Sequence, residues 1–215
     1  VTVGHHLVCG IRIDDTPECW ADNGAYAPTS AAQAEFVVAG YGEANFGEYH
    51  DVCALEKDTG DLRCSGTSSL GSNMPSGFCC DNPWLQLDVF GITSGICGVT
   101  QDNRLTCWQG SNSYYDQIPT DADNGDAPYT DWIQVTAGDG HYCGLHSDGV
   151  LDCWGWNYFG QSDIPTDTDG SAYTDWVAVS AAETHTCGIR NTNEAVCWGG
   201  SDGFAAGVVP TQLDG

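Results

Sequence analysis

Four histidines stand shortly before the first cysteine of a recurring sequence unit, where their side chains could bind a metal ion or an anion. They are His6, His50, His141 and His185. Neutral imidazole is a common metal ligand, and closure of the units around one axis would array the four rings around it. The same recurrence is expected if a histidine makes one structural hydrogen bond in each unit. We favour this second interpretation and predict no bound cofactor.

Aspartates cluster in two similar connections, "PTDADNGDAPYTDW" and "PTDTDGSAYTDW", and oxygen ligands at alternate positions suit calcium. They are Asp121, Asp123, Asp126 and Asp131 in the first connection and Asp167, Asp169 and Asp175 in the second. A twelve-residue calcium loop needs a bidentate Glu at its last position, whereas Trp132 stands there when Asp121 is counted first. Solvated acidic loops are therefore the favoured interpretation, with calcium as the alternative.

The sequence contains no recognisable catalytic motif, and we predict that the protein is not an enzyme. It has no Gly-x-Ser-x-Gly elbow, no His-Glu-x-x-His and no Gly-rich phosphate loop. Acidic residues number 30 against 5 Lys plus Arg, for a formal net charge of -25. Binding a phosphate backbone needs a basic face, so no nucleic-acid partner is expected. Because no stretch of about 18 apolar residues occurs, no membrane insertion is expected either.

Twelve cysteines with no Cys-x-x-Cys pair indicate disulfides rather than a zinc site, and therefore a secreted protein. Ten of them form five pairs: Cys9 and Cys19, Cys53 and Cys64, Cys97 and Cys107, Cys143 and Cys153, Cys187 and Cys197. Nine residues separate the members of four pairs and ten separate Cys53 from Cys64, so that hairpin needs a longer loop or a bulge. Cys79 and Cys80 are adjacent, and three options stay open for them: a vicinal disulfide, bonds to other cysteines, or links between molecules.

The cysteine pairs define a repeat that covers the chain, and we predict a single domain over residues 1–215. Their first members are 44, 44, 46 and 44 residues apart. Each unit opens with alternating apolar and polar residues, as in residues 131–138 and 175–182, which predicts a first strand. A short hairpin follows, with turn residues such as Asp102-Asn103 or Asp148-Gly149. Each unit is thus a small antiparallel meander whose two cysteines face each other across neighbouring strands.

Two more positions recur around the cysteines. A small residue follows the first cysteine (Gly10, Ala54, Gly98, Gly144, Gly188), and Trp follows the second (Trp20, Trp108, Trp154, Trp198). A sheet this small cannot bury its faces alone, so we expect the units to stack, with the small residue admitting the neighbouring unit and Trp filling the gap. Radial closure then predicts an all-β fold, a β-propeller of five blades of about 43 residues each.

The units around Cys143 and Cys187 resemble the repeats of the regulator of chromosome condensation family. The segments "HYCGLHSDGVLDCWGWNYFGQ" and "HTCGIRNTNEAVCWGG" carry the resemblance, and the family's Gly-x-Asn-x-x-Gly-Gln ending is matched by Gly155, Asn157, Gly160 and Gln161. The resemblance implies a β-propeller, and the paired cysteines are similar to those of the family's secreted branch. Nuclear members bind chromatin and act on a small GTPase. This chain departs from them in its acidity and its cysteines, so that activity is not expected here.

Aromatic residues in the connections predict a contact surface. Tyr114 and Tyr115 follow the third cysteine pair, and Trp156, Tyr158 and Phe159 follow the fourth. Aromatic side chains on loops suit sugar stacking or a protein interface, because they bury much area with little loss of rotamer freedom. Packing across a blade junction is the alternative interpretation.

Val1 and Val3 belong to a segment that resembles the end of a first strand without its opening half. Residues 208–213 could complete this strand and close the propeller, or a neighbouring molecule could supply the missing edge. We favour closure within the chain. Val1 and Val3 therefore join the aromatic residues as candidate interface residues.

These features predict a non-enzymatic extracellular structural or interaction protein, foremost a self-assembling subunit of an extracellular fibre or surface coat. Five hairpin disulfides suit a protein that must persist outside the cell. The first alternative is a carbohydrate-binding lectin propeller with sites between its blades. The second is an inhibitor of a secreted enzyme, which rests on analogy of fold alone. The expected partners are copies of the same chain or glycans.

Overall fold

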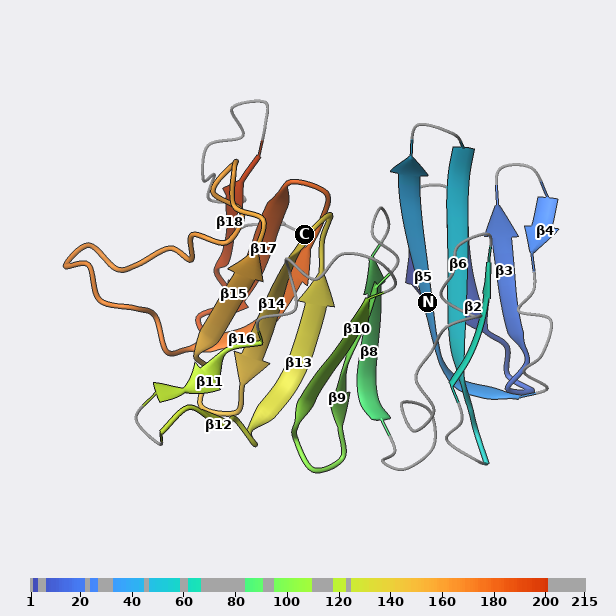
Figure 1. The fold of residues 1–215 in the computed structure, drawn as a ribbon, viewed down its shortest axis with the longest axis horizontal. Helices are drawn as coiled ribbons and strands as arrows, with labels where there is room; N and C mark the ends of the chain where they lie inside the picture. The colour runs from blue at the N-terminus through green and yellow to red at the C-terminus, as the bar shows by residue number, and fades with distance from the viewer. Residues whose placement is uncertain are drawn as a thin grey trace, which may run out of the picture. The chain divides into compact units, whose positions relative to one another are not determined.

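The computed structural model describes residues 2–3, 7–21, 24–26, 33–44, 47–58, 62–66, 84–90, 95–109, 118–122 and 125–200. Every named element of this described part is a β-strand (Figure 1). The predicted all-β fold is therefore confirmed.

Five antiparallel sheets of three or four strands follow one another along the described part of the chain, and each corresponds to one repeat unit, here called a blade. Blade 1 contains β1 (Thr2–Val3), β2 (Leu7–Ile11), β3 (Pro17–Ala21) and β4 (Gly24–Tyr26), and blade 2 contains β5 (Ala34–Ala44), β6 (Gly47–Glu56) and β7 (Leu62–Gly66). Blade 3 contains β8 (Trp84–Phe90), β9 (Gly95–Thr100) and β10 (Leu105–Gln109), and blade 4 contains β13 (Trp132–Ala137), β14 (His141–His146) and β15 (Leu151–Gly155). Blade 5 contains β16 (Trp176–Ala181), β17 (His185–Arg190) and β18 (Ala195–Gly199). The strands of each blade pair in chain order, which is the predicted meander.

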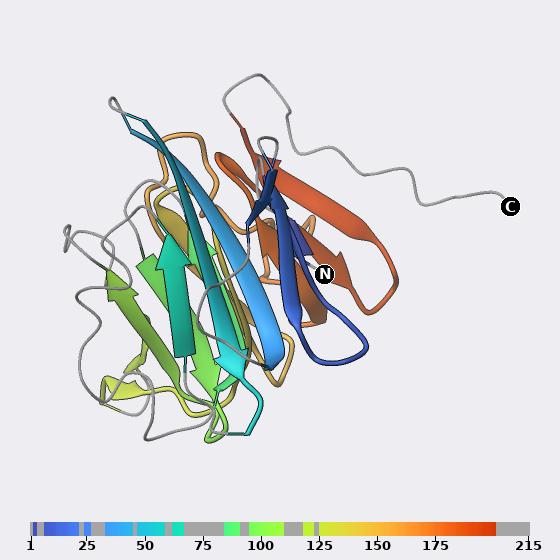
Figure 2. The same ribbon diagram turned by 90° about the vertical axis from the view of Figure 1, so that its right-hand side faces the viewer.

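The chain divides into two compact units. The first contains Val1–Gln101 and Cys107–Ser113, and the second contains Asp102–Thr106 and Tyr114–Gly215. Within the first unit β5 lies beside β2 and β8, and within the second β16 lies beside β13 and β14. Successive blades of a unit therefore pack on one another through their first strands. The long β5–β6 hairpin, blue to cyan in Figure 2, gives blade 2 the longest paired strands of the described sheets.

Four of the five predicted disulfides lie within the described residues and pair as predicted: Cys9–Cys19, Cys97–Cys107, Cys143–Cys153 and Cys187–Cys197. Each joins directly opposed residues of the second and third strands, with Cα–Cα distances of 4.0 to 4.1 Å. Cys53 is also disulfide-bonded and lies opposite Cys64 in the register of β6 and β7. The extra residue of that hairpin lies in its loop, because the register around the cysteines matches that of the other blades. Cys79 and Cys80 lie outside the described residues.

The first strand of blades 2 to 5 contains a β-bulge at its second residue. The register with the second strand shifts between Ala34 and Phe36, Trp84 and Gln86, Trp132 and Gln134, and Trp176 and Ala178. A bulged residue leaves the hydrogen-bonded ladder. In blades 3, 4 and 5 that residue is the exposed aliphatic side chain of Leu85, Ile133 and Val177. Residue alternation predicted these strands but not their bulges.

The small residue after the first cysteine has a different role from the one predicted. A Cβ atom on Gly144 would lie 2.2 Å from the ring of Trp132, which belongs to the same blade. The glycine therefore makes room for its own blade's first-strand tryptophan rather than for a neighbouring blade. The same pairing occurs twice more: Gly98 with Trp84 and Gly188 with Trp176.

The turn of the second hairpin uses residues that tolerate a left-handed backbone. Positive φ values occur at Asp15 (64°), Asn103 (59°), Gly149 (86°) and Asn193 (66°). The predicted turns at Asp102-Asn103 and Asp148-Gly149 are thereby confirmed. In the second unit the Asn103 carbonyl accepts the N–H of Trp132, and the Gly149 carbonyl accepts that of Trp176, both at 3.1 Å. The turn of one blade thus fixes the start of the next.

Each blade has two faces, which we name after the residues they carry. The disulfide face carries the cysteines, and the tryptophan face is the opposite one, named after the Trp that follows the second cysteine in blades 1, 3, 4 and 5. At the junction of blades 4 and 5, the disulfide face of blade 4 packs against the tryptophan face of blade 5 in one hydrophobic core: Cys143, Leu145 and Leu151 against Trp176, Val179 and Trp198.

Blade 2 provides an internal comparison for the glycine–tryptophan pair, because it has Ala54 after its first cysteine and Ala34 at the tryptophan position. We expect Gly144→Ala to destabilise the disulfide-intact protein by about 1–3 kcal/mol through overpacking against Trp132. In a Trp132→Ala background the same change should cost little, since the obstructing ring is gone. The measurement is a double-mutant cycle from denaturant unfolding. Equal costs in both backgrounds would contradict the assigned contact.

Candidate binding surface

The loop that follows β15, residues 156–163, carries three aromatic side chains in mutual contact, and we name it the aromatic loop. The rings of Trp156 and Tyr158 stack with centroids 6.4 Å apart and planes 12° apart. Phe159 meets them edge-on, at 5.4 Å from Trp156 and 5.0 Å from Tyr158. Tyr158 is 79% exposed, whereas the other two rings are half-buried. The three predicted contact residues of this connection thus form one cluster with Tyr158 at its solvent side.

Asn157 closes the aromatic loop with its side chain. Its Nδ2 donates to Oδ1 of Asp163 at 2.7 Å, and its Oδ1 accepts the N–H of Ser162 at 2.9 Å. The buried Gln161 accepts the N–H of Phe159 through Oε1, also at 2.9 Å. These bonds fix the loop before any partner binds, which lowers the entropy cost of a contact made through it.

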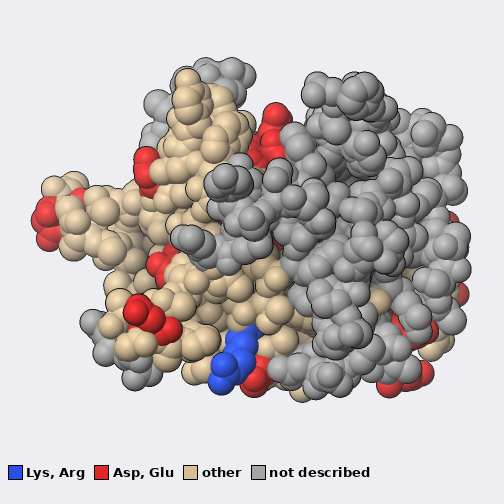
Figure 3. Space-filling model, in the orientation of Figure 1, with Lys and Arg blue, Asp and Glu red and all other residues tan. Residues whose placement is uncertain are grey.

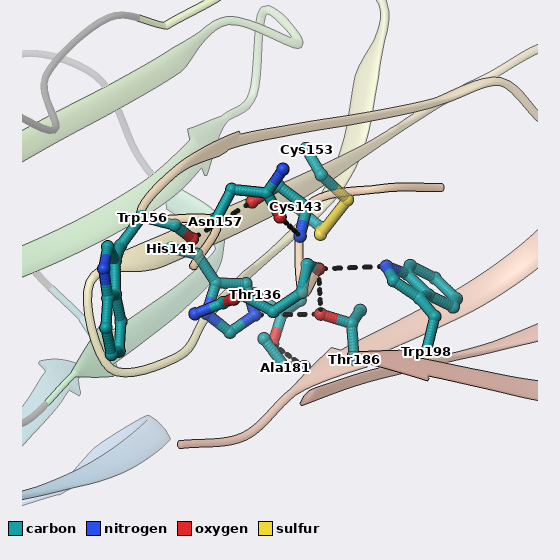
Figure 4. Close-up of a disulfide and its surroundings, with 11 residues drawn as sticks. Thr136, His141, Cys143, Cys153, Trp156, Asn157, Ala181, Thr186 and Trp198 are labelled. Carbon is teal, nitrogen blue, oxygen red and sulfur yellow. Dashed lines mark hydrogen bonds between the residues drawn. A yellow bond between two sulfur atoms is a disulfide. The ribbon is translucent and has the colours of Figure 1, made fainter. Parts of the chain in front are cut away.

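A buried polar chain lies beneath this loop and joins blades 4 and 5 (Figure 4). The Thr186 hydroxyl donates to the Gln161 carbonyl at 2.9 Å, and the same carbonyl accepts the indole N–H of Trp198 at 2.9 Å. The Thr186 hydroxyl has a single proton, so it accepts from His141, whose Nε2 lies 2.8 Å away. The proton of the neutral His141 ring is therefore on Nε2.

His141 is held neutral by its surroundings. Burial, with a smaller contribution from His185, lowers the pKa of His141 to about 4. Its hydrogen bond to Thr186 of the next blade is the structural role favoured from the sequence, and it is confirmed for this histidine. His185 occupies the same position of blade 5 but is exposed.

The alternative interpretation, an array of four equivalent histidines, does not match their spacing in the sequence. His141 and His185 stand two residues before the first cysteine of their blades, whereas His6 and His50 stand three before it. A shift of one residue moves a strand position to the other face. Among the residues that the structure describes, no group of three His, Cys, Asp or Glu side chains is placed to hold a metal ion.

Polar side chains of β13 bind the backbone of β16 across the same junction. The amide of Gln134 donates to the Val179 carbonyl at 2.8 Å and accepts its N–H at 3.1 Å. The Thr136 hydroxyl oxygen accepts the N–H of Ala181 at 3.0 Å. These residues were not singled out from the sequence. The signal that could have found them is the constant offset of 45 residues that they share with the His141–Thr186 pair.

Two of the aspartates considered for calcium have protein partners instead. Asp131 lies 2.9 Å from Nδ1 of His146, whose Nε2 lies 3.2 Å from Asp152. Burial acts to lower the pKa of His146, but these two carboxylates outweigh it and raise that pKa above its ordinary value. At the equivalent position of blade 5, Asp175 forms a two-pronged ion pair with Arg190 at 2.9 and 3.1 Å.

The other aspartates of the two connections lie in local turns. Asp167 and Asp169 are exposed and accept hydrogen bonds from residues next to them in the chain, Thr168 and Ser171. In the first connection Asp121 belongs to β11 (Thr120–Asp121), which pairs with β12 (Ala127–Pro128), and Asp126 closes that hairpin by donating its N–H to the Asp121 carbonyl. The first connection thus contains a short hairpin, and in the second Thr166 and Ala172 form an isolated bridge around the exposed Asp167 and Asp169. Asp123 lies outside the described residues.

Several predicted interface residues also lie outside the described part: Tyr114, Tyr115 and Val1. Val3 belongs to β1 and pairs with Val8 of β2, as Ala137 pairs with Tyr142 in blade 4. The backbone of Thr2–Val3 thus has the predicted place at the end of a first strand. The proposed partner of that strand, residues 208–213, lies outside the described residues.

The charge of the surface is mostly negative where it is described. Figure 3 shows acidic side chains at several separate places on one face, with few basic ones. Burial and the nearby Glu183 raise the pKa of one carboxyl, that of Asp139, to about 6. No helix of the described residues is long and apolar enough to span a membrane.

The architecture is similar to that of several solved structures. The CRINKLY WD40 ectodomain of the Arabidopsis thaliana receptor kinase ACR4 superposes with a TM-score of 0.65 at 21% identity, over 96% of this chain and 66% of that one. The ectodomain of the Physcomitrella patens receptor kinase CR4 gives 0.52 at 22% identity, over 78% and 42%. Prp20p from Saccharomyces cerevisiae gives 0.60 at 15% identity, over 90% and 56%. The chain thus spans between 42% and 66% of the length of these structures.

The fold is a β-propeller, as predicted. Residues 132–161, which form blade 4 and the first part of the aromatic loop, match the regulator of chromosome condensation (RCC1) repeat. The predicted resemblance is therefore confirmed for the blade in which the sequence motif is complete.

The lowered pKa of His141 and the raised pKa of Asp139 predict opposite pH dependences. In the unfolded chain His141 takes up a proton below pH 6.5, whereas in the folded chain it does so only below about pH 4. This group therefore lowers the stability of the fold as the pH falls from 6.5 to about 4. Asp139 reduces stability as the pH rises from 3.8 to about 6, since only the folded chain keeps that proton. The wild type should show the two effects partly offset.

The test is the free energy of unfolding between pH 4 and 7 for two variants. Asp139→Asn should lose stability more steeply than the wild type as the pH falls, because the His141 effect is then unopposed. His141→Gln keeps an amide donor toward Thr186, and its free energy of unfolding should fall less than that of the wild type as the pH is lowered. Parallel curves for the wild type and both variants would contradict the assignment.

Proposed function

We propose that this protein is an extracellular, non-enzymatic subunit that assembles with copies of itself into a fibre or surface coat. The observation that carries the proposal is the aromatic loop, in which a hydrogen-bonded scaffold holds Tyr158 79% exposed against two supporting rings. Exposed aromatic side chains in fixed positions are typical centres of protein interfaces.

Other features support an extracellular setting. Disulfides close the hairpins of the described blades and persist in oxidising compartments. Two of the similar solved structures are receptor ectodomains. Exposed aliphatic side chains at the same bulge of three successive blades, Leu85, Ile133 and Val177, add further apolar contact points.

A lectin is the second candidate, and the same loop favours it. The nearly parallel planes of Trp156 and Tyr158, 12° apart, offer an aromatic face to the apolar side of a sugar ring. Polar groups of Asn157 and Asp163 lie in the same loop. Glycan binding by a protein that stays monomeric, lost on Tyr158→Ala, would favour the lectin.

Assembly should be visible in light scattering after size exclusion and in negative-stain electron microscopy of the unreduced protein, from micromolar to millimolar concentration. We expect Tyr158→Ala to weaken assembly about tenfold or more, the loss typical of an interface aromatic. Tyr158→Phe keeps the ring and should assemble like the wild type. A wild type that remains a 22.8 kDa monomer at all concentrations would overturn the proposal.

A further inference from the structure

His146 lies between two carboxylates, and each of its ring nitrogens faces one of them. Nδ1 is 2.9 Å from an oxygen of Asp131, which directly precedes β13, and Nε2 is 3.2 Å from an oxygen of Asp152 in β15. A carboxylate only accepts hydrogen bonds, and a neutral imidazole has a single N–H to donate. Both contacts are therefore hydrogen bonds only when the ring carries two protons and a positive charge. We name these three side chains the His146 clamp.

The surroundings of the ring suit its charged form. The His146 side chain is 4% exposed, whereas those of Asp131 and Asp152 are 40% and 34% exposed. Burial acts to lower the pKa of His146, and the two carboxylates, which are the charged groups that act on the ring, raise it above its ordinary value of 6.5. The ring also lies against Trp132 and Tyr129, with centroids 3.8 and 4.6 Å away. Aromatic rings at such distances attract a cation through their faces.

Blade 5 contains a permanent version of this clamp. The same four residues, Tyr-Thr-Asp-Trp, open both blades, at 129–132 and 173–176, but the residue three positions after the first cysteine of blade 5 is Arg190 instead of a histidine. Arg190 donates to both carboxylate oxygens of Asp175, and its guanidinium lies 3.8 Å from the centre of the Tyr173 ring. Because an arginine is always charged, this second clamp does not depend on pH.

The His146 clamp fastens the residues that lead into blade 4. Besides its side-chain contact, Asp131 accepts the N–H of Ser147 with its backbone carbonyl, at 2.9 Å. The next residue is held by other groups, because the N–H and the carbonyl of Trp132 bond to Asn103 at 3.1 and 2.8 Å. The clamp therefore acts on the chain before Trp132, which leads back to the β11–β12 hairpin.

We propose that His146 is a pH-sensitive switch, which fastens the segment before β13 to blade 4 when the ring is protonated and releases it when the ring becomes neutral. A neutral ring presents a nitrogen lone pair to one of the two carboxylates. Whichever nitrogen keeps its proton, Asp131 loses a cationic partner and with it the charge-assisted part of the contact. This inference goes beyond the proposed function and does not rest on it.

The direction of the pH dependence follows from the raised pKa of His146. Below pH 6.5 the ring is charged whether the segment is fastened or released, so the clamp contributes fully. As the pH rises above 6.5 the released form loses its proton first, and the advantage of the fastened form shrinks until the pH passes the raised pKa. Each unit by which fastening raises that pKa corresponds to an about tenfold loss of fastened over released segment.

Two NMR measurements on the disulfide-intact protein, between about pH 6 and 9, test the switch. The first is a ¹⁵N titration of the His146 ring, assigned by comparison with His146→Gln. It should show two protonated nitrogens at pH 6 and a pKa above 6.5. The second is the hydrogen exchange of the Ser147 N–H, corrected for the intrinsic rate at each pH. Its protection should fall about tenfold for each unit by which the measured pKa exceeds 6.5.

The repeat supplies matched controls. The Asn191 N–H bonds to the Asp175 carbonyl at 2.8 Å, as Ser147 does to its partner in blade 4, and should keep its protection because Arg190 stays charged. His146→Arg copies the clamp of blade 5 and should make the protection of Ser147 independent of pH. Arg190→His should transfer the pH dependence to Asn191. Circular dichroism of each variant checks that it folds.

A His146 ring with only one protonated nitrogen at pH 6 would overturn the proposal. So would a Ser147 protection that stays constant in the wild type while the ring titrates, since the clamp would then not release the segment. If His146→Arg does not fold, His146→Gln gives the same comparison, because glutamine does not titrate and Ser147 should show a constant protection. A decrease in His146→Gln equal to that of the wild type would assign the pH dependence to another group and overturn the proposal.

Discussion

The structure depends on the covering of each sheet by the next, because a single three-stranded sheet has no second layer against which to bury its faces. The residues of each blade serve this packing. The glycine after the first cysteine lets the blade's own first-strand tryptophan lie over it, and the disulfide occupies the other face. The result at blades 4 and 5 is a core in which one blade supplies cysteines and aliphatic side chains and the next supplies tryptophans.

Hydrophobic packing is not directional, so polar groups must fix how one blade is placed on its neighbour. At the junction of blades 4 and 5 they do so through Gln134, Thr136 and His141, each of which bonds to the residue 45 positions later in the chain. Buried polar atoms need such partners, and a slip of one residue would break all three contacts. This placement of the blades also requires a neutral His141, because a charged ring would be costly to bury.

Much of this fold could be predicted from the sequence because two features report directly on geometry. The spacing of cysteines fixed the hairpins, their register and their disulfides, and strand alternation located the first strands. The β-bulges could not be predicted, because one extra residue does not disturb an alternating pattern enough to be noticed. The partner of Gly144 was misjudged for a related reason: the pattern shows that a small residue is needed but not which ring requires it.

The sequence identified the aromatic residues of the candidate site but not how their rings are arranged. Trp156, Tyr158 and Phe159 were recognisable as too aromatic for an ordinary turn, whereas their mutual stacking depends on the hydrogen bonds of Asn157 and Gln161. The alternative of a histidine array required equivalent positions, but His141 stands two residues before its first cysteine and His50 three. A difference of one residue reverses the face of a strand.

The scarcity of positive charge limits how such a protein can meet another copy of itself. Of its five Lys and Arg residues, four already pair with carboxylates within the chain: Arg12 with Glu18, Lys57 with Asp15, Arg104 with Asp102, and Arg190 with Asp175. Little cationic surface is therefore left to attract an acidic neighbour, and two copies repel each other at long range. A contact between copies must then come from apolar faces, which act only after salt has screened the repulsion to a few ångströms. Among the described residues, Tyr158 of the aromatic loop, 79% exposed, is one apolar side chain that meets that requirement.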